Sequence, residues 1–369
     1  MDRFDILIVG GGIAGASLGA EVARARRTLL IEAEEHPGMH STGRSAAFWL
    51  ESYGGAEVAP LSTASHDFLS RPPADFADEG FLSPRGAIHV DQSGRADAFA
   101  GIPAVVETLA MSRAELEAAV PGIDSRWVQA RVEPGCADID VAGLHAAYLR
   151  QFRRRGGVVR TNARMVAASW SGGSWRVRLE DGGEIEAAIL VDAAGAWADQ
   201  VAEIAGVAPI GIAPKRRTMV QLRVGRSGIA RMPQVIDAGG SFYFKGEGER
   251  SVWISPHDEI ASGPCDAKPE EIDIAVAIDR FERAVDWPVE AVERSWAGLR
   301  SFAPDRLPVF GFDVAVPGFF WFAGQGGFGI QTAPAAAKLA AAVLLAEAPD
   351  PMVAEIDPAA YSPARFSPR

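Results

Sequence analysis

Three glycines near the N-terminus have the spacing of a phosphate-binding turn. Gly10, Gly12 and Gly15 follow an apolar run at 6–9, which is typical of a buried parallel strand, and a helix-like run at 14–25 comes next. In such a turn the first glycine permits the sharp change of direction and the second lets the backbone approach a pyrophosphate. The third lets the helix pack against the strand. The N–H groups that begin the helix then face the phosphates, where the helix dipole favours negative charge.

An acidic residue stands where such a turn requires one. Glu32 ends a second apolar run at 28–31, about twenty residues after Gly12, the spacing at which a carboxylate binds ribose hydroxyls and repels a 2′-phosphate. The alternative is an ordinary strand–helix–strand unit with a surface glutamate. The strand, the helix and the acid together favour dinucleotide binding.

Composition excludes several other classes of protein. The chain has 369 residues, 48% of them hydrophobic and 23% charged, which is typical of a globular protein large enough for two domains. Its net charge of −12 argues against nucleic acid or an anionic membrane as a partner. No apolar run has the length of a membrane span, and the first strand begins too early for a signal peptide. We therefore expect a cytoplasmic protein.

Neither the cysteines nor the histidines form a recognisable metal site. Cys136 and Cys265 lie outside any C-x-x-C pattern, so they predict neither a disulfide framework nor a zinc site. The six histidines are scattered without metal-ligand spacing. The sequence predicts no metal.

Periodicity and end signals give the expected elements. A loop at 40–47 is predicted to lead into a helix through Tyr53, and Ser112 with Glu115 forms a capping-box pattern. Further helices are expected at 60–71, 112–119, 141–154, 269–285 and 333–346. Strands are expected at 86–90, 128–132, 158–161, 165–170, 175–179, 189–191, 291–296 and 319–323, with an antiparallel sheet over 218–255. The strand at 319–323 runs into a second glycine-rich helix start, which suggests a discontinuous nucleotide domain.

Five motifs together resemble a known family. They are H-S-T-G-R-S-A-A at 40–47, A-P-K-R-R at 213–217, S-F-Y at 241–243, W-A-G-L-R-S-F at 296–302 and Q-G-G-F-G-I-Q-T at 325–332. With the first glycine turn, this set resembles the FAD-dependent D-amino acid oxidase-like family, which includes glycine and sarcosine oxidases. Within the family it is most similar to bacterial D-arginine dehydrogenases. The resemblance covers almost the whole chain.

The resemblance implies an α/β fold and a division into two domains. A discontinuous Rossmann-like FAD-binding domain is expected over 1–80, 135–210 and 305–369, and a mixed or antiparallel substrate-binding domain over 81–134 and 211–304. The FAD is expected to be non-covalent. In the covalently flavinylated relatives a cysteine follows the arginine of the L-R-S-F-like segment, where this chain has Ser301 and Phe302.

Most of the implied FAD-binding positions are small residues that allow close approach. They are Gly10, Gly12, Ala14, Gly15, Glu32, Ala33, Ser41, Thr42, Gly43, Arg44, Ser45, Ala46, Ala47, Phe48, Val166, Gly195, Gly326, Gly327, Phe328, Gly329, Ile330 and Gln331. The loop at 41–48 is expected to wrap the pyrophosphate and the flavin edge, although its Ser and Thr also suit a helix N-cap. Residues 326–331 are expected to place a helix N-terminus near the C2=O and N1 end of the flavin.

Four residues are the implied catalytic set. Arg300 is expected to hold a substrate carboxylate bidentately, with Arg217 as a second cation and with Tyr53 and Tyr243 as hydroxyl partners. The alternatives are a structural ion pair for each arginine and core packing for each tyrosine. The implied reaction transfers hydride from Cα of an amino acid to flavin N5, and the imino acid is then hydrolysed to a 2-oxo acid and ammonia.

The side-chain pocket is expected at Phe48, Leu50, Ala87 and Gly327. The resemblance implies that D-arginine enzymes carry a glutamate at the position of Ala87, so this chain is expected to lack the partner for a cationic side chain. We therefore expect a D-amino acid with a neutral or apolar side chain. An N-methyl amino acid or glycine oxidase, a 2-hydroxy acid dehydrogenase, an NAD-dependent dehydrogenase and a non-catalytic flavin-binding module remain alternatives. The sequence assigns neither the electron acceptor nor the oligomeric state.

Overall fold

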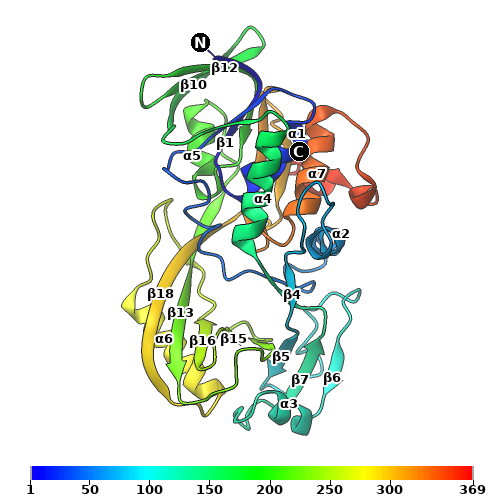
Figure 1. Cartoon of the computed structure of the whole chain (residues 1–369), viewed down its shortest axis with the longest axis vertical. Coiled ribbons are helices and arrows are strands. Elements are labelled where there is room, and N and C mark those ends of the chain that lie inside the picture. Colours follow the sequence, from blue (N-terminus) through cyan, green and yellow to red (C-terminus); the bar gives the residue numbers. More distant parts are fainter. Residues whose placement is uncertain (1, 368–369) are drawn as a thin grey trace.

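Two large sheets organise the chain (Figure 1). The computed structural model describes residues 2–367. The first sheet has eight strands, with a parallel centre and antiparallel edges. Its strands are β1 (Asp2–Val9), β2 (Thr28–Ile31), β9 (Val158–Arg160), β10 (Met165–Ser171), β11 (Ser174–Leu179), β12 (Glu184–Asp192), β19 (Val309–Phe312) and β20 (Phe319–Ala323). β1, which begins at Asp2, is a central strand of this sheet.

The central strands are apolar because helices cover them. β2 and β20 are buried along their whole length, which is typical of parallel strands with both faces covered. The helices of this part are α1 (Ile13–Val22), α2 (Ala59–Ser70), α4 (Val141–Arg154), α5 (Ala198–Ile204) and α7 (Ala333–Leu345). Short 3₁₀ turns lie at Gly195–Trp197, Pro351–Val353, Pro358–Tyr361 and Pro363–Phe366. β1 pairs in parallel with β2 and β12, so their carboxyl ends meet at one edge of the sheet, beside Val9, Ile31 and Asp192.

The second sheet has ten strands and is mostly antiparallel. Its strands are β5 (Ala87–Asp91), β6 (Leu109–Met111), β7 (Gln129–Glu133), β13 (Ala213–Val224), β14 (Gln234–Asp237), β15 (Tyr243–Gly246), β16 (Ser251–Ser255), β17 (Ile260–Ala261), β18 (Val289–Phe302) and β21 (Gln325–Gly326). Helices α3 (Arg113–Ala119) and α6 (Glu271–Ala284) pack against this sheet around a core that contains Phe242, Phe244 and Phe281. The long pair β13 and β18 runs from this body toward the first sheet (Figure 1). A small sheet of β3 (Phe48–Trp49), β4 (Leu82–Pro84) and β8 (Ala137–Ile139) completes the fold.

Several expectations from the sequence are confirmed. The fold is α/β with a second mixed sheet, and β20 leads through a glycine-rich turn into α7. Asp140 caps α4 by accepting from the Gly143 N–H, and Ser112 forms the capping box with Glu115. The residue boundaries of the two domains stay a prediction.

The helix expected through Tyr53 is wrong. Residues 48–49 form β3, which pairs with β8, and turns follow. Distant partners take the backbone N–H groups that a helix would use: Leu50 N donates to Gln331 Oε1 at 3.2 Å and Ser52 N donates to Glu133 Oε1 at 3.2 Å. Tertiary hydrogen bonds here override local helix preference.

Within residues 2–367, no helix is both long enough and apolar enough to cross a membrane.

Candidate active site

A cavity of about 610 Å³ is lined by residues of both large sheets and of the segment that joins β2 to β3. Most of the positions predicted from the sequence line this cavity. They are Gly10, Gly12, Ala14, Glu32, Ala33, Ser41, Thr42, Arg44, Ser45, Ala46, Ala47, Phe48, Leu50, Tyr53, Val166, Gly195, Arg217, Tyr243, Arg300, Gly326, Gly327, Gly329, Ile330 and Gln331. Residues more than 300 positions apart in the chain thus share one cavity.

Four predicted positions lie behind the lining. Gly15 and Gly43 have structural surroundings: a Cβ at Gly15 would overlap the Gly10 carbonyl oxygen, and one at Gly43 would lie 2.7 Å from Gly38 O. Phe328 is buried in a cluster with Val58 and Phe302. Ala87, predicted to line the side-chain pocket, is completely buried and packs with Leu50 and Cys136.

One end of the cavity is built from the first glycine turn. Gly10 has φ +107°, and a Cβ there would lie 2.5 Å from Ala193 O, so only glycine suits this position. The turn is held by Glu32, whose Oε2 accepts from Gly11 N at 2.8 Å and whose Oε1 accepts from Glu34 N at 3.0 Å. We call this part of the cavity the nucleotide end.

The nucleotide end suits a dinucleotide with a diphosphate. Gly12, the N-cap of α1, makes no side-chain cap, and Gly12, Ile13 and Ala14 at the helix start line the cavity. Among the first-turn N–H groups, that of Ile13 already donates to Thr42 Oγ1 at 3.0 Å. Apolar side chains of Ile31 and Met165 also line this end, where a flat base could pack.

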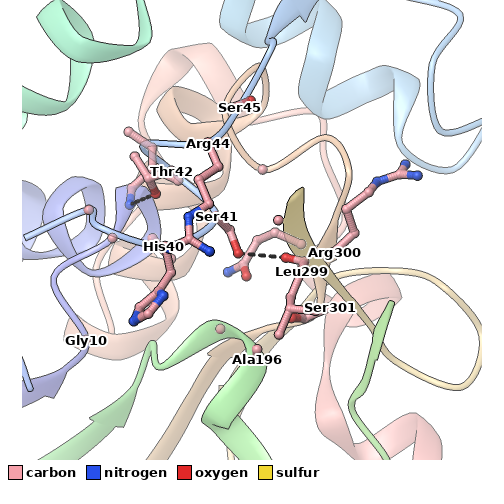
Figure 2. Close-up of a pocket in the computed structure, with 18 of the residues that line it drawn as sticks. Gly10, His40, Ser41, Thr42, Arg44, Ser45, Ala196, Leu299, Arg300 and Ser301 are labelled. Carbon is pink, nitrogen blue, oxygen red and sulfur yellow. Dashed lines mark hydrogen bonds between the residues drawn. The ribbon is translucent and has the colours of Figure 1, made fainter. Parts of the chain in front are cut away.

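The segment 40–47 is anchored to the second sheet. Ser41 Oγ donates to Leu299 O at 2.6 Å, Arg44 Nη1 donates to Ala267 O at 2.9 Å, and Trp296 Nε1 donates to Arg44 O at 2.9 Å. Figure 2 shows Ser41 beside Leu299, with the Arg300 side chain extending away from His40 and Gly10. The segment therefore connects the nucleotide end to the β18 strand that carries Arg300.

The opposite end of the cavity contains Arg300. Its side chain is only 13% exposed, and its Nη1 lies 3.3 Å from Glu259 Oε1. Both oxygens of Glu259 already pair with Arg306, at 2.9 and 3.0 Å. Burial, with a smaller contribution from the Arg306 cation, lowers the pKa of Arg300 to about 9, so Arg300 is still charged at neutral pH. An anion placed against this guanidinium would relieve both effects.

Gly327 and Tyr53 lie directly against Arg300. A Cβ at Gly327 would overlap Arg300 Nη2 and the Tyr53 hydroxyl, so a side chain here would displace both groups. The Arg300 Cζ lies 5.6 Å from the centre of the Tyr53 ring. The structure thus brings together three of the residues that the resemblance implied.

Arg217 and Tyr243 lie at this same end. Arg217 Nε donates to Asp258 O at 2.7 Å, and Nη2 lies 3.6 Å from Glu259 Oε1 with no hydrogen-bond partner within residues 2–367. The Arg217 Cζ is 5.9 Å from the Tyr243 ring centre, and the Tyr243 hydroxyl donates to Met219 Sδ at 3.3 Å. We call the part of the cavity around Arg217 and Arg300 the substrate end.

The two ends differ in charge. Among the described residues the carboxylates that line the cavity are Glu32 and Glu34, both at the nucleotide end. The substrate end has two guanidinium groups and apolar walls from Phe48, Leu50, Met219 and Ile236. It therefore favours a ligand with a carboxylate and without a cationic side chain.

Sequence reasoning missed several lining residues. His257 and Gln234 reach the substrate end, and Trp197 lies at the nucleotide side, where its ring centre is 4.7 Å from that of His40, the first residue of the motif at 40–47. No spacing pattern marks His257 or Gln234, because each comes from a different loop or strand. Only the tertiary fold brings them together.

The comparisons with known proteins agree with this geometry. The family model described as "FAD dependent oxidoreductase", DAO, matches residues 5–343. The chain belongs to this family. It is an FAD-dependent oxidoreductase, and the residues of the nucleotide end are those that would hold the FAD.

Relatives span nearly the whole enzyme. The chain is 27% identical over 388 residues to a glycine oxidase of Pseudomonas aeruginosa, covering 97% of this chain and 98% of that protein. It is 26% identical over 412 residues to FAD-dependent oxidoreductase domain-containing protein 1 of Bos taurus, covering 93% and 82%. The fold is similar to glycine oxidase from Geobacillus kaustophilus, with a TM-score of 0.79, 20% identity and coverage of 97% and 98%. It is similar also to L-proline dehydrogenase from P. horikoshii, with a TM-score of 0.82, 20% identity and coverage of 99% and 98%.

Proposed function

We propose that this enzyme oxidises a D-amino acid with a neutral or apolar side chain, giving an imino acid that water hydrolyses to a 2-oxo acid and ammonia. The single observation that supports this most is the buried guanidinium of Arg300, which faces the cavity beside Gly327 and Tyr53. Similarity to a glycine oxidase along nearly the whole chain supports an amino acid rather than another carboxylate.

The protein's part in the reaction is to bind and orient. Arg300 holds the substrate carboxylate in a planar fork, and the Tyr53 hydroxyl beside it adds a further donor. Arg217 supplies a second positive charge from the neighbouring strand. FAD, when bound, supplies the two-electron acceptor for the hydrogen on Cα. With the carboxylate fixed at one point, the walls of the cavity decide which substituent of Cα faces the cofactor.

The side-chain preference follows from what the cavity lacks. Phe48 and Leu50 give an apolar wall, and the described residues of the substrate end include no lining carboxylate. Glu133, the acid paired in register with Ala87, is itself buried and committed to His89 Nε2 at 3.0 Å. Burying a substrate guanidinium here would cost several kcal/mol. We therefore propose that D-arginine is a poor substrate, and the particular likeness to D-arginine dehydrogenases stays a prediction.

We also keep the two-domain division as part of this proposal. Residues 1–80, 135–210 and 305–369 would form the discontinuous FAD-binding domain, and 81–134 and 211–304 the substrate-binding domain. The cavity, with lining residues from both parts, would be the place where they meet.

Anaerobic reduction of the bound flavin tests the proposal. The purified enzyme is mixed with D-leucine, D-phenylalanine, D-arginine, D-lysine, their L-enantiomers, sarcosine and 2-hydroxy acids, and loss of flavin absorbance is followed. We expect the fastest reduction with D-leucine or D-phenylalanine. Preference for D-arginine would refute the side-chain argument, and reduction by 2-hydroxy acids alone would identify a hydroxy acid dehydrogenase. Failure of every compound would favour a non-catalytic flavin-binding protein.

A further inference from the structure

His257 is a cavity residue whose hydrogen-bonding state the structure defines. It lies in the segment between β16 and β17, with φ 55°, and it lines the substrate end. Its Nδ1 lies 2.6 Å from Gly240 O. A carbonyl oxygen only accepts hydrogen bonds, so Nδ1 carries the hydrogen and, in the neutral ring, Nε2 is the acceptor. Within the part of the chain that the structure describes, the ring hydrogen bond of His257 is the one at Nδ1, and Nε2 has none.

Burial and the Arg217 charge keep the His257 ring neutral. Burial and the Arg217 cation lower the pKa of His257 to about 4, against smaller opposing effects of the Gly240 hydrogen bond, Glu259 and Asp237. Arg280 of α6 also lies nearby, since its guanidinium donates to the carbonyls of Ser241 and Pro256. A neutral imidazole with a free acceptor therefore faces the substrate end at neutral pH.

Few side chains at this end could take up a proton. Gln234 also offers an acceptor, because its Oε1 is buried with no hydrogen-bond partner within the described residues, but a neutral amide oxygen accepts a hydrogen bond without taking up a proton at neutral pH. The Tyr243 hydroxyl donates to Met219 Sδ, and Tyr53 lies against Arg300. Arginines only donate hydrogen bonds. The described part of the chain places no Asp or Glu side chain in the lining here.

We propose that Nε2 of His257 accepts a hydrogen bond, and then a proton, from the α-amino group of the substrate. This inference rests on the function proposed above. In the step, one N–H bond of the substrate ammonium breaks and the N–H bond at Nε2 forms. The electron pair stays on the substrate nitrogen, so nothing is oxidised or reduced. The imidazolium later returns the proton to water.

Substrate binding itself would strengthen this base. Burial and, to a smaller extent, the Arg217 charge oppose protonation of His257 in the resting protein. A substrate carboxylate against Arg217 and Arg300 would cancel part of that charge, because opposite charges in a poorly solvated site interact strongly. The bound carboxylate would thus place the substrate amine near His257 and also raise the proton affinity of His257. His257 would be a catalytic residue and not only part of the cavity wall.

Two inert ligands separate the role of the amine from that of the carboxylate. 2-Aminoisobutyrate has no hydrogen on Cα and cannot be oxidised, and 2,2-dimethylpropanoate has a methyl group in place of the amine. Both are titrated into the FAD-loaded enzyme by calorimetry. We expect the wild type to bind the amino compound about tenfold more tightly, the effect of one hydrogen bond to a charged group. Signals of isotope-labelled histidine should show Nε2 of His257 accepting a hydrogen bond with the amino ligand only.

Two variants separate hydrogen bonding by the His257 ring from proton transfer to it. His257→Asn suits the positive φ and keeps an N–H donor for Gly240, but it removes Nε2. We expect it to lose the preference for the amino ligand, to bind 2,2-dimethylpropanoate as before, and to lower kcat/KM for the best amino acid about a hundredfold. His257→Gln places an amide oxygen near the position of Nε2, so it should restore ligand preference without restoring the rate.

Specific outcomes would overturn the inference. These are equal binding of the two ligands by the wild type, an Nε2 signal of His257 that is the same in both complexes, or wild-type kcat/KM in His257→Asn. In each case flavin reduction by amino acids in the wild type would leave the proposed function standing. A wild type that no amino acid reduces would refute the proposed function, and this inference with it. The histidine signals of the wild type decide the matter even if the variants fold poorly.

Discussion

The two ends of the cavity are built in different ways. At the nucleotide end the glycine turn lines the cavity, and one carboxylate, Glu32, accepts from Gly11 N in that turn and from Glu34 N in the segment after β2. At the substrate end, side chains from β13, β15 and β18 and from turns meet around Arg300. The nucleotide end recognises a ligand by its shape and through backbone N–H groups, and the substrate end recognises a ligand by its charge. A common cofactor can therefore be kept while the substrate changes with a few side chains.

The first prediction tests the charged end directly. Arg300→Met should lower kcat/KM for the best amino acid about a thousandfold, about 4 kcal/mol, because a buried bidentate partner of the carboxylate is lost. The FAD content should not change, since Arg300 belongs to the substrate end. Steady-state kinetics and the flavin-to-protein ratio measure the two effects. Arg294→Lys, an exposed change on the same strand, is the control. Loss of FAD together with activity would show that the two ends are not separate.

The second prediction concerns the space that Gly327 leaves. Gly327→Ala should lower kcat/KM about a hundredfold, mainly through KM, because the added methyl group overlaps Arg300 Nη2 and the Tyr53 hydroxyl. Gly101→Ala is the matched control, since a Cβ at Gly101 meets no atom within 4 Å. Kinetics of the two variants side by side would decide. Wild-type KM in Gly327→Ala would mean that Arg300 does not need this position to bind the carboxylate.

The comparison also explains how much the sequence could predict. The turn at Gly10 and the acid at Glu32 are local features with fixed spacing, so the nucleotide end and the α/β class followed from the sequence itself. The roles of Arg300 and Tyr53 were predicted from the family resemblance only, since no local sequence pattern links β18 to a turn after β3. The role of His257 was not predicted from the sequence, because it depends on a tertiary hydrogen bond to Gly240 and on the nearby Arg217 charge. Local rules failed also at Tyr53, where bonds from Leu50 and Ser52 to distant residues replaced the expected helix.

The third prediction follows from the low pKa of His257. The pKa of His257 is about 4 in the folded protein, against an ordinary value of 6.5. Between pH 6.5 and 4, His257 is therefore protonated in the unfolded chain but stays neutral in the folded protein. The free energy of unfolding should therefore fall as the pH is lowered from 6.5 to 4, by about 2 kcal/mol from this residue after allowance for its partial exposure. Urea unfolding across this range measures it. His257→Asn should show a shallower decline, and parallel curves for the two proteins would contradict the assignment.

The smallest expected effect belongs to the nucleotide end. Glu32→Gln keeps the size of the side chain but removes the charge that holds Gly11 N and that would bind the ribose hydroxyls. We expect the Kd for FAD to rise about tenfold, about 1.4 kcal/mol, with kcat unchanged at saturating FAD. Glu35→Gln, an exposed neighbour, is the control. Fluorescence titration of the apoenzyme with FAD measures the Kd. A fall in kcat at saturating FAD would show that Glu32 reaches the substrate end, and would overturn the separation of the two ends on which the other predictions depend.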